Sequence, residues 1–165
     1  MTSSSVCQPH NHNICIEDAL TRAEAVCEQR GVRLTPLRKT VLALVWQNHR
    51  PLGAYALMAM LEQEQEDTRR IAPPTVYRAL DFLLENGLIH RVHRLNAYIG
   101  CPDPEYPHAG NLLICRQCGV AVEMDAQPLA DALQAMASHY GFQGEDHTLE
   151  VIGLCGRCQT MGNNP

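Results

Sequence analysis

Residues 73–100 read PPTVYRALDFLLENGLIHRVHRLNAYIG, and this stretch decides the fold. Two prolines open it and Asn86-Gly87 interrupts it, so the apolar positions between these signals predict one helix. Residues 88–92 and 97–99 then alternate in polarity on either side of a turn, which predicts a short β-hairpin. A helix that runs directly into a hairpin is typical of a winged helix-turn-helix domain, whose last helix enters the major groove of DNA.

Upstream of this stretch the sequence predicts three further helices. The first covers residues 16–30 and ends at Gly31. The second begins at Thr35 and Pro36, because threonine can cap free N–H groups and proline suits the first helical position. The third covers residues 52–65. A helical domain with an added hairpin and no DNA contact is the alternative to a winged-helix domain.

Charge is distributed unevenly along the 165 residues, whose formal net charge is −5. Residues 1–94 carry 11 Lys/Arg and 10 Asp/Glu, whereas residues 95–165 carry 2 and 8. The basic residues thus lie in the half predicted to be helical, as expected of a nucleic-acid-binding domain. Tyr77 and Arg78 fall in the first turn of the last helix, where they are free to point outward.

Residues 101–110 are rich in proline and glycine and are predicted to form a hinge. A small β-β-α-β module follows, with strands at 112–114, 120–124 and 149–154 and a helix that starts at Pro128. One face of this helix collects four large apolar side chains: Leu129, Leu133, Met136 and Tyr140. A module this small would be stabilised by a metal ion and by pairing with a second copy.

The predicted fold class is therefore α+β. We expect a flexible tail at residues 1–15 and a winged helix-turn-helix domain at 16–100, followed by the hinge. A small α/β dimerisation domain with a structural zinc site is expected at residues 111–165.

Two Cys-x-x-Cys pairs mark the ends of the strand–helix–strand unit, and they consist of Cys115, Cys118, Cys155 and Cys158. Four thiolates can surround zinc tetrahedrally at roughly 2.3 Å. One pair alone would also suit a redox motif, whereas two pairs at this spacing indicate a closed structural zinc site. Disulfides, or an iron centre of rubredoxin type, are the alternatives.

Four more residues of metal-ligand type are spread over the hairpin, the hinge and the second module: His90, Cys101, His108 and Glu123. One thiolate, two imidazoles and one carboxylate suit four-coordinate zinc. The alternative is that His90 is an ordinary core histidine and that the others are scattered over the surface.

Cysteine usage and the lack of targeting signals indicate where the protein works. No apolar run approaches the roughly 18 residues of a membrane span, and the N-terminus lacks the pattern of a signal peptide. We therefore expect a cytoplasmic protein without a membrane partner, whose eight cysteines are metal ligands or free thiols. An additional site could form from Cys7, His10, His12 and Cys15, although a disordered tail is the simpler interpretation.

Catalytic motifs are missing from the chain. It contains no His-Glu-x-x-His, no Gly-x-Ser-x-Gly and no phosphate-binding glycine loop. The deaminase signature also fails, since His108 is followed by Ala109 and Gly110 rather than by x-Glu. We expect the protein not to be an enzyme.

Taken together, these stretches resemble the ferric uptake regulator superfamily, and most closely its zinc uptake regulator branch. The resemblance is carried by RLTPLR at 33–38, PPTVYRALDFLLENG at 73–87, HRV at 90–92 and the two Cys-x-x-Cys pairs. It covers roughly residues 17–158, and the PPTVYRALDFL run is highly specific.

The resemblance implies a homodimer with N-terminal winged-helix domains, C-terminal α/β dimerisation domains and two Zn²⁺ per chain. The four cysteines of the Cys-x-x-Cys pairs match a structural zinc site. The other four residues match a regulatory zinc site at the hinge. Tyr77 and Arg78 fall in the recognition helix, and Tyr55 matches a tyrosine that contacts DNA in this family. We expect three further residues to bind DNA phosphates: Arg33, Arg38 and Lys39.

The implied function is a zinc-responsive transcription regulator, whose zinc-loaded dimer binds a palindromic operator in double-stranded DNA and represses zinc uptake genes. Iron-sensing and peroxide-sensing relatives carry a histidine-rich run before the first Cys-x-x-Cys, whereas residues 108–114 contain one histidine. The thiolate of Cys101 also favours zinc over iron. The alternatives are an iron- or peroxide-responsive regulator of the same fold, and a zinc-ribbon module that binds protein instead of DNA.

Overall fold

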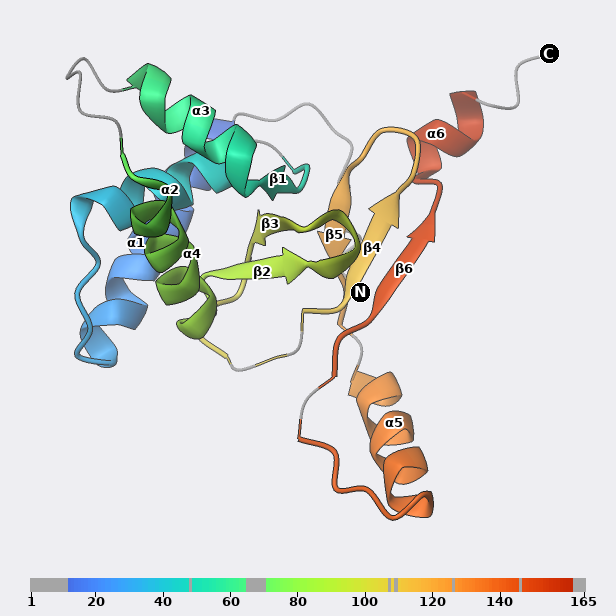
Figure 1. Cartoon of the computed structure of the whole chain (residues 1–165). Helices are drawn as coiled ribbons and strands as arrows, with labels where there is room; N and C mark the ends of the chain where they lie inside the picture. Colours follow the sequence, from blue (N-terminus) through green and yellow to red (C-terminus); the bar gives the residue numbers. More distant parts are fainter. Residues whose placement is uncertain are drawn as a thin grey trace.

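The computed structural model describes residues 12–47, 49–64, 71–106, 108, 110–125, 127–145 and 147–161. Their helices and strands form two groups around two small sheets (Figure 1). The N-terminal group contains α1 (His12–Gln29), α2 (Pro36–Trp46), β1 (Leu52–Gly53), α3 (Ala54–Glu64), α4 (Pro73–Glu85), β2 (Ile89–Val92), the 3₁₀ helix η1 (His93–Leu95) and β3 (Ala97–Gly100). The C-terminal group contains β4 (Leu112–Cys115), β5 (Ala121–Glu123), α5 (Gln127–His139), β6 (Glu150–Gly153) and α6 (Gly156–Met161).

The four N-terminal helices enclose the main core. Its largest fully buried side chains include six leucines from α2, α3 and α4: Leu42, Leu44, Leu57, Leu61, Leu80 and Leu83. Helix α4 starts with prolines in its first turn and ends at Asn86, followed by Gly87 with φ +64°. Glycine adopts this left-handed conformation without steric cost, so the chain can turn sharply into β2.

Strands β1, β3 and β2 form the first sheet in that order, and all neighbours are antiparallel. The turn between β2 and β3 is η1, and Asn96 closes it with φ +46°. At the end of β3, a Cβ on Gly100 would lie 2.2 Å from the Trp46 ring. The wing hairpin, residues 89–100, is thus packed tightly against α2.

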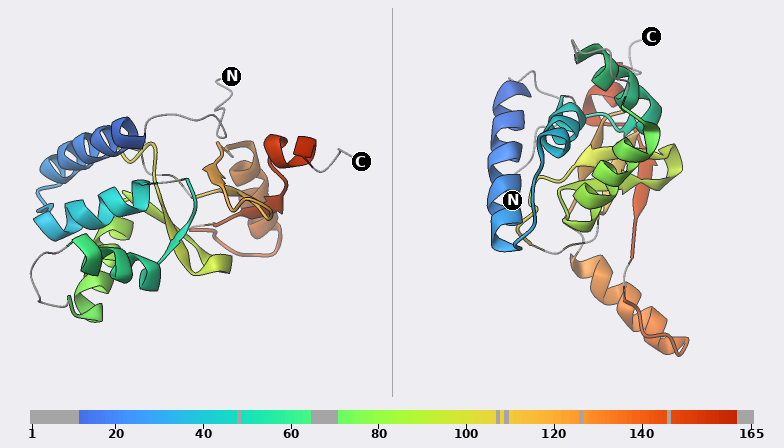
Figure 2. Two further views of the ribbon diagram at one scale, coloured as in Figure 1. Left: turned by 90° about the horizontal axis from the view of Figure 1, so that it is seen from above. Right: turned by 60° about the vertical axis from the view of Figure 1, so that its left-hand side comes forward.

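Strands β5, β4 and β6 form the second sheet, in which β4 pairs antiparallel with β5 and parallel with β6. Helix α5 lies in the connection between β5 and β6. It extends away from both sheets (Figures 1 and 2). Its apolar residues Leu133, Met136 and Tyr140 consequently remain exposed.

The two sheets meet through a small shared core. Val92 and Ile99 of the wing pack with Leu112, Ile114 and Ala121 of the second sheet. The backbone N–H of Ala121 also donates to the carbonyl of His49 at 2.9 Å. These contacts join the N-terminal group to the second sheet.

The α+β class and the helix–hairpin order agree with the prediction, but several boundaries differ. Helix α1 begins at His12, so Cys15 is helical, while Cys7 and His10 lie outside the described residues. Leu52 and Gly53 form a strand instead of starting the third helix, because they pair with β3. Thr35 occupies the N-cap of α2 without a side-chain hydrogen bond.

A further difference is α6, which was not predicted and contains Cys158. A search of the described residues for a helix with the length and apolarity of a membrane span found none.

Candidate metal centres

The first candidate centre lies at one end of the second sheet, where the parallel strands β4 and β6 both finish. Cys115 ends β4 and Cys118 follows in its turn, whereas Cys155 and Cys158 lie at the start of α6. All four sulfur atoms lie within 4.8 Å of one another. A zinc tetrahedron with 2.3 Å bonds requires sulfur atoms roughly 3.8 Å apart, and Cys118 Sγ and Cys155 Sγ are 3.7 Å apart.

The surroundings of this Cys₄ centre suit thiolate ligands. The backbone N–H groups of Cys118 and Cys155 are directed at the Cys115 sulfur, and they lower the pKa of that thiol to about 6. The Cys155 N–H lies 3.3 Å from this sulfur. None of the cysteines in the described residues forms a disulfide. The site therefore fits a tetrahedral metal better than the disulfides left open by the sequence.

The second candidate centre joins the wing to the second sheet. His90 comes from β2, Cys101 directly follows β3, His108 lies in the hinge, and Glu123 ends β5. One possible ligand atom from each residue lies within 4.8 Å of the others. The backbone N–H of Cys101 donates to the Leu88 carbonyl at 3.1 Å, which holds the thiol beside the wing.

The donor atoms of this hinge cluster converge closely. The Nε2 atoms of His90 and His108 lie 3.1 and 2.7 Å from Glu123 Oε1. Cys101 Sγ lies 3.5 Å from His108 Nε2. The side chains of His90 and Glu123 are each only 12% exposed. Four possible zinc ligands, two imidazoles, one thiol and one carboxylate, thus surround one point.

Hydrogen bonding in the hinge cluster is incomplete without a cation. Within the described part of the chain, His90 Nε2 and both carboxylate oxygens of Glu123 are buried and make no hydrogen bond, although Glu123 Oε1 lies within ion-pair distance of both histidines. Buried polar atoms are nearly always paired, because desolvation is otherwise uncompensated. A metal ion at the centre would satisfy all three atoms.

Two neighbours that were not predicted orient the histidines. His108 Nδ1 lies 2.6 Å from the Tyr106 carbonyl, so Nδ1 carries the proton and Nε2 is left free to bind a metal. A Cβ on Gly110 would lie 2.7 Å from His90 Nδ1, so the backbone at Gly110 holds the His90 ring. The Pro/Gly-rich composition of the hinge was the only sequence signal for such close contacts.

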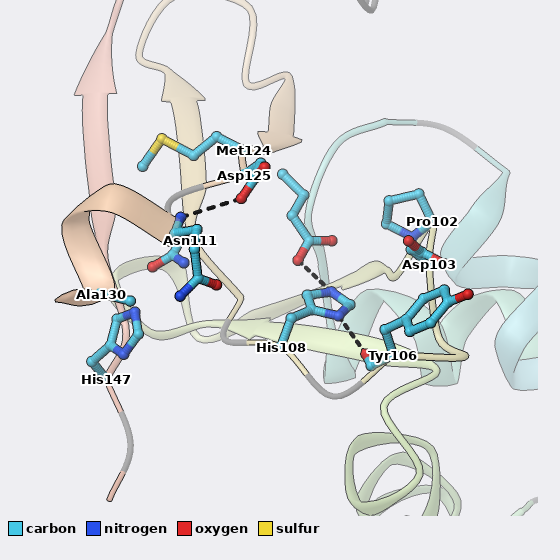
Figure 3. Close-up of a pocket in the computed structure, with 11 residues that line it drawn as sticks. Pro102, Asp103, Tyr106, His108, Asn111, Met124, Asp125, Ala130 and His147 are labelled. Atoms are coloured by element: carbon cyan, nitrogen blue, oxygen red, sulfur yellow. Dashed lines mark hydrogen bonds and ion pairs between the residues drawn. The ribbon is translucent and has the colours of Figure 1, made fainter. Parts of the chain in front are cut away.

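Cys101 is 3% exposed, and burial, followed by the nearby Glu123 carboxylate, raises the pKa of its thiol to about 12. A cavity of about 410 Å³ nevertheless opens beside the cluster and is lined by His108 and Glu123 (Figure 3). Tyr106, Asn111, Asp125 and His147 line it as well. Solvent can therefore reach His108 and Glu123 from this side.

The predicted DNA-binding residues belong to the N-terminal group, where Arg33 lies in the connection between α1 and α2 and the others lie on helices. Tyr55 is 81% exposed on α3, and Tyr77 and Arg78 are exposed on α4. The Arg38 guanidinium stacks on the Phe82 ring at 3.5 Å and bonds to the Arg33 carbonyl.

Lys39 forms an ion pair with Glu24 of α1. Its ammonium group is thus already partly neutralised. The predicted contact of this residue with phosphate is untested.

Sequence comparison relates the chain to known regulators. The model of the ferric uptake regulator family matches residues 29–152. The zinc uptake regulation protein of Escherichia coli is 38% identical over 143 residues, which are 86% of this chain and 82% of the relative.

Comparison with solved structures also finds similarity to zinc uptake regulators. A zinc uptake regulator complexed with zinc and DNA is 37% identical and has a TM-score of 0.84, covering 90% of this chain and 98% of that one. Holo XcZur is 40% identical with a TM-score of 0.77, covering 86% and 96%. Apo XcZur, also 40% identical, has a TM-score of 0.50, covering 87% and 97%.

Proposed function

The chain belongs to the ferric uptake regulator family, and from this premise we propose that it is a zinc-responsive DNA-binding repressor of zinc uptake genes. The family consists of transcription regulators rather than enzymes. The zinc-loaded form is a homodimer with two Zn²⁺ per chain, one at the Cys₄ centre and one at the hinge cluster. Its partner is a palindromic operator in double-stranded DNA.

The observation that carries this proposal is the composition of the hinge cluster. His90 belongs to the wing, whereas Glu123 belongs to the second sheet, and their donor atoms lie 3.1 Å apart. Zinc bound here would neutralise the thiolate and the carboxylate and link the two parts of the chain. The orientation of the wing, and hence of α4, thereby depends on the metal.

The energy available from such a site is sufficient. Moving an equilibrium from 1:99 to 99:1 requires roughly 5.5 kcal/mol of differential binding. Protein zinc sites that fold around the metal reach roughly 10–16 kcal/mol. A hinge cluster that is complete in just one orientation of the wing can therefore act as a switch.

The Cys₄ centre has a different role, because all four ligands belong to the C-terminal group. It ties the β4–β5 turn to α6 and stabilises a module with a small core. The exposed apolar face of α5 in this module, defined by Leu133, Met136 and Tyr140, is covered by a second copy of the chain. The dimer would place two α4 helices on successive half-sites, about 34 Å apart.

The relatives support a metal-selected orientation. The chain superposes better on the zinc- and DNA-bound relative and on holo XcZur than on apo XcZur, although all three have similar sequence identity to it. The thiolate of Cys101 further favours zinc over iron at the hinge cluster.

DNA binding to the promoter fragment of the chain's own gene tests the proposal. Fluorescence anisotropy would be recorded while a chelator buffer sets the free zinc concentration. We expect tight binding that appears as free zinc rises, and no comparable response to Fe²⁺ or peroxide. Binding that is indifferent to zinc would contradict the sensing role of the hinge cluster. Absence of binding at every zinc level would favour a protein-interaction module.

A further inference from the structure

A carboxylate of the second sheet binds the tip of the wing, outside both metal centres. Glu150 is the first residue of β6. Its Oε1 accepts a hydrogen bond from the backbone N–H of His93 at 2.5 Å, and its Oε2 accepts one from the N–H of Arg94 at 3.2 Å. Both donors belong to the first turn of η1, which joins β2 to β3 at the end of the wing (Figure 1).

This contact fixes direction as well as distance. The first N–H groups of a helix have no partner within the helix, and hydrogen bonds from them to a carboxylate are strengthened by its charge. The two carboxylate oxygens accept from two adjacent N–H groups. Rotation of the wing about one of these hydrogen bonds therefore breaks the other. The neighbouring contact between Val92 and Leu112 is apolar and does not set a direction by itself.

The position of Glu150 follows from strand pairing. Glu150 is opposite Leu112 in the parallel pair of β4 and β6. Leu112 is fully buried in the core that the wing and the second sheet share. The same register that buries Leu112 therefore brings the Glu150 carboxylate to the wing tip.

We propose that Glu150 is a positioning residue that holds the wing in its DNA-binding orientation, and that it thereby lowers the zinc concentration required for DNA binding. The inference rests on the proposed function, but Glu150 contacts none of the hinge-cluster ligands. It stabilises the orientation in which the hinge cluster is complete. Since coupling between two sites is reciprocal, loss of the carboxylate must weaken the response to zinc.

Glu150→Gln tests this, with Glu145→Gln as the matched control, because Glu145 is an exposed acid of the same module. The amide of glutamine has the shape of the carboxylate but turns an NH₂ group toward one of the two donors. We expect the free zinc concentration at half-maximal DNA binding to rise at least about fivefold in Glu150→Gln, the lower end of typical coupling factors. DNA affinity at saturating zinc should stay near that of the unsubstituted protein.

For binding to DNA itself, the change of charge acts in the opposite direction. Each substitution removes one negative charge, which slightly strengthens binding to the polyanionic DNA. A zinc midpoint of Glu150→Gln that equals or lies below that of Glu145→Gln would overturn the proposal. Zinc content and sedimentation verify that both variants keep their metal and their dimer.

A measurement without DNA separates this inference from the proposed function. Fluorescent amino acids would be placed at the exposed positions Glu62 on α3 and Ala135 on α5, in dimers diluted with unlabelled chain. In the absence of hinge zinc, we expect Glu150→Gln to have a broader distance distribution than Glu145→Gln. Equal distributions would overturn the role of Glu150, even if the unsubstituted protein responds to zinc.

The wing side offers a second variant if Glu150→Gln folds poorly. Arg94→Pro removes one N–H donor, and proline is tolerated in the first turn of a helix. The same broadening of the distance distribution is expected. An unchanged distribution in Arg94→Pro would contradict the proposal.

Discussion

At the scale of single residues, the two metal centres differ in what orients their ligands. Backbone N–H groups support the sulfur of Cys115 in the Cys₄ centre. In the hinge cluster, a carbonyl orients His108 and a glycine holds His90. The ligands of the hinge cluster thus depend on the conformation of the hinge, whereas those of the Cys₄ centre depend on the module itself.

Replacing the Cys101 thiol distinguishes the role of the hinge cluster from that of the Cys₄ centre. Cys101→Ser removes a soft ligand, so we expect loss of zinc-dependent DNA binding while the variant stays folded and dimeric. Anisotropy under buffered zinc, with sedimentation for the dimer, checks this. Cys15→Ser, which alters a half-exposed thiol of α1, is the control and should behave as the unsubstituted protein. A full zinc response in Cys101→Ser would rule out the thiol as a ligand.

Gly110→Ala is expected to weaken the hinge cluster without replacing a ligand. The new Cβ would lie 2.7 Å from His90 Nδ1 and would displace the ring. Because residues that orient ligands typically contribute 10–100-fold to metal affinity, we expect a loss of about that size. Chelator competition measures it. Gly53→Ala is the control, because a Cβ there meets open space, and it should leave the zinc affinity unchanged. Equal zinc affinities in the two variants would contradict the role of Gly110 in holding the His90 ring.

At the scale of elements, α4 has a buried face and an exposed face, and we propose that the exposed face binds DNA. Leu80 and Leu83 are fully buried in the N-terminal core, whereas Tyr77 and Arg78 are exposed. The prolines at its start and the glycine after its end fix where these faces begin and end. Substitutions on the exposed face should therefore change DNA binding without changing the fold.

Arg78→Ala tests this division. If Arg78 reads a base edge, its loss should cost about 1–3 kcal/mol of DNA-binding free energy and relax the sequence preference at one position. The zinc midpoint and the melting temperature should stay unchanged. Anisotropy with operator variants measures the effect, and Arg157→Ala, an equal change of charge on α6, should lose far less affinity. Similar losses in the two variants would argue against a reading role.

At the scale of the whole molecule, the two groups of elements meet at the wing and leave α5 extended into solvent (Figure 2). The shared core, the hinge cluster and Glu150 all connect the same two sheets. The apolar face of α5 points away from this junction and has no cover within the described chain. On the proposed function, the junction sets the orientation of α4, and the partner subunit covers α5.

Met136→Glu should dissociate the dimer. Met136 is 59% exposed in the single chain, so a charge there is tolerated by the monomer and is costly inside an apolar interface. Sedimentation velocity should show a monomer with unchanged helix content, and operator affinity should fall with it. Ala135→Glu adds the same charge to an exposed neighbour and should stay dimeric. A dimeric Met136→Glu would place the interface elsewhere.

Local signals in the sequence were sufficient for the types of most elements. Prolines, glycines and the period of apolar residues act over a few positions, so α2, α4 and the wing were predicted close to their observed limits. The strand at Leu52 and Gly53 was mistaken for helix, because its structure depends on pairing with Tyr98 and Ala97 more than 40 residues away. Helix α6 was missed because its short sequence has no apolar period.

The sequence by itself determined which chemistry is available: eight residues of metal-ligand type, four of them in two Cys-x-x-Cys pairs, a wing after a helix, and an apolar face on the predicted α5. Only the tertiary structure decided that His90 and Glu123 meet, that Gly110 holds the His90 ring, and that Glu150 reaches the wing tip. The physical reason is that residue types and turns are set by neighbours along the chain. Convergence of distant side chains instead depends on strand register and on how two sheets pack, which spacing does not encode.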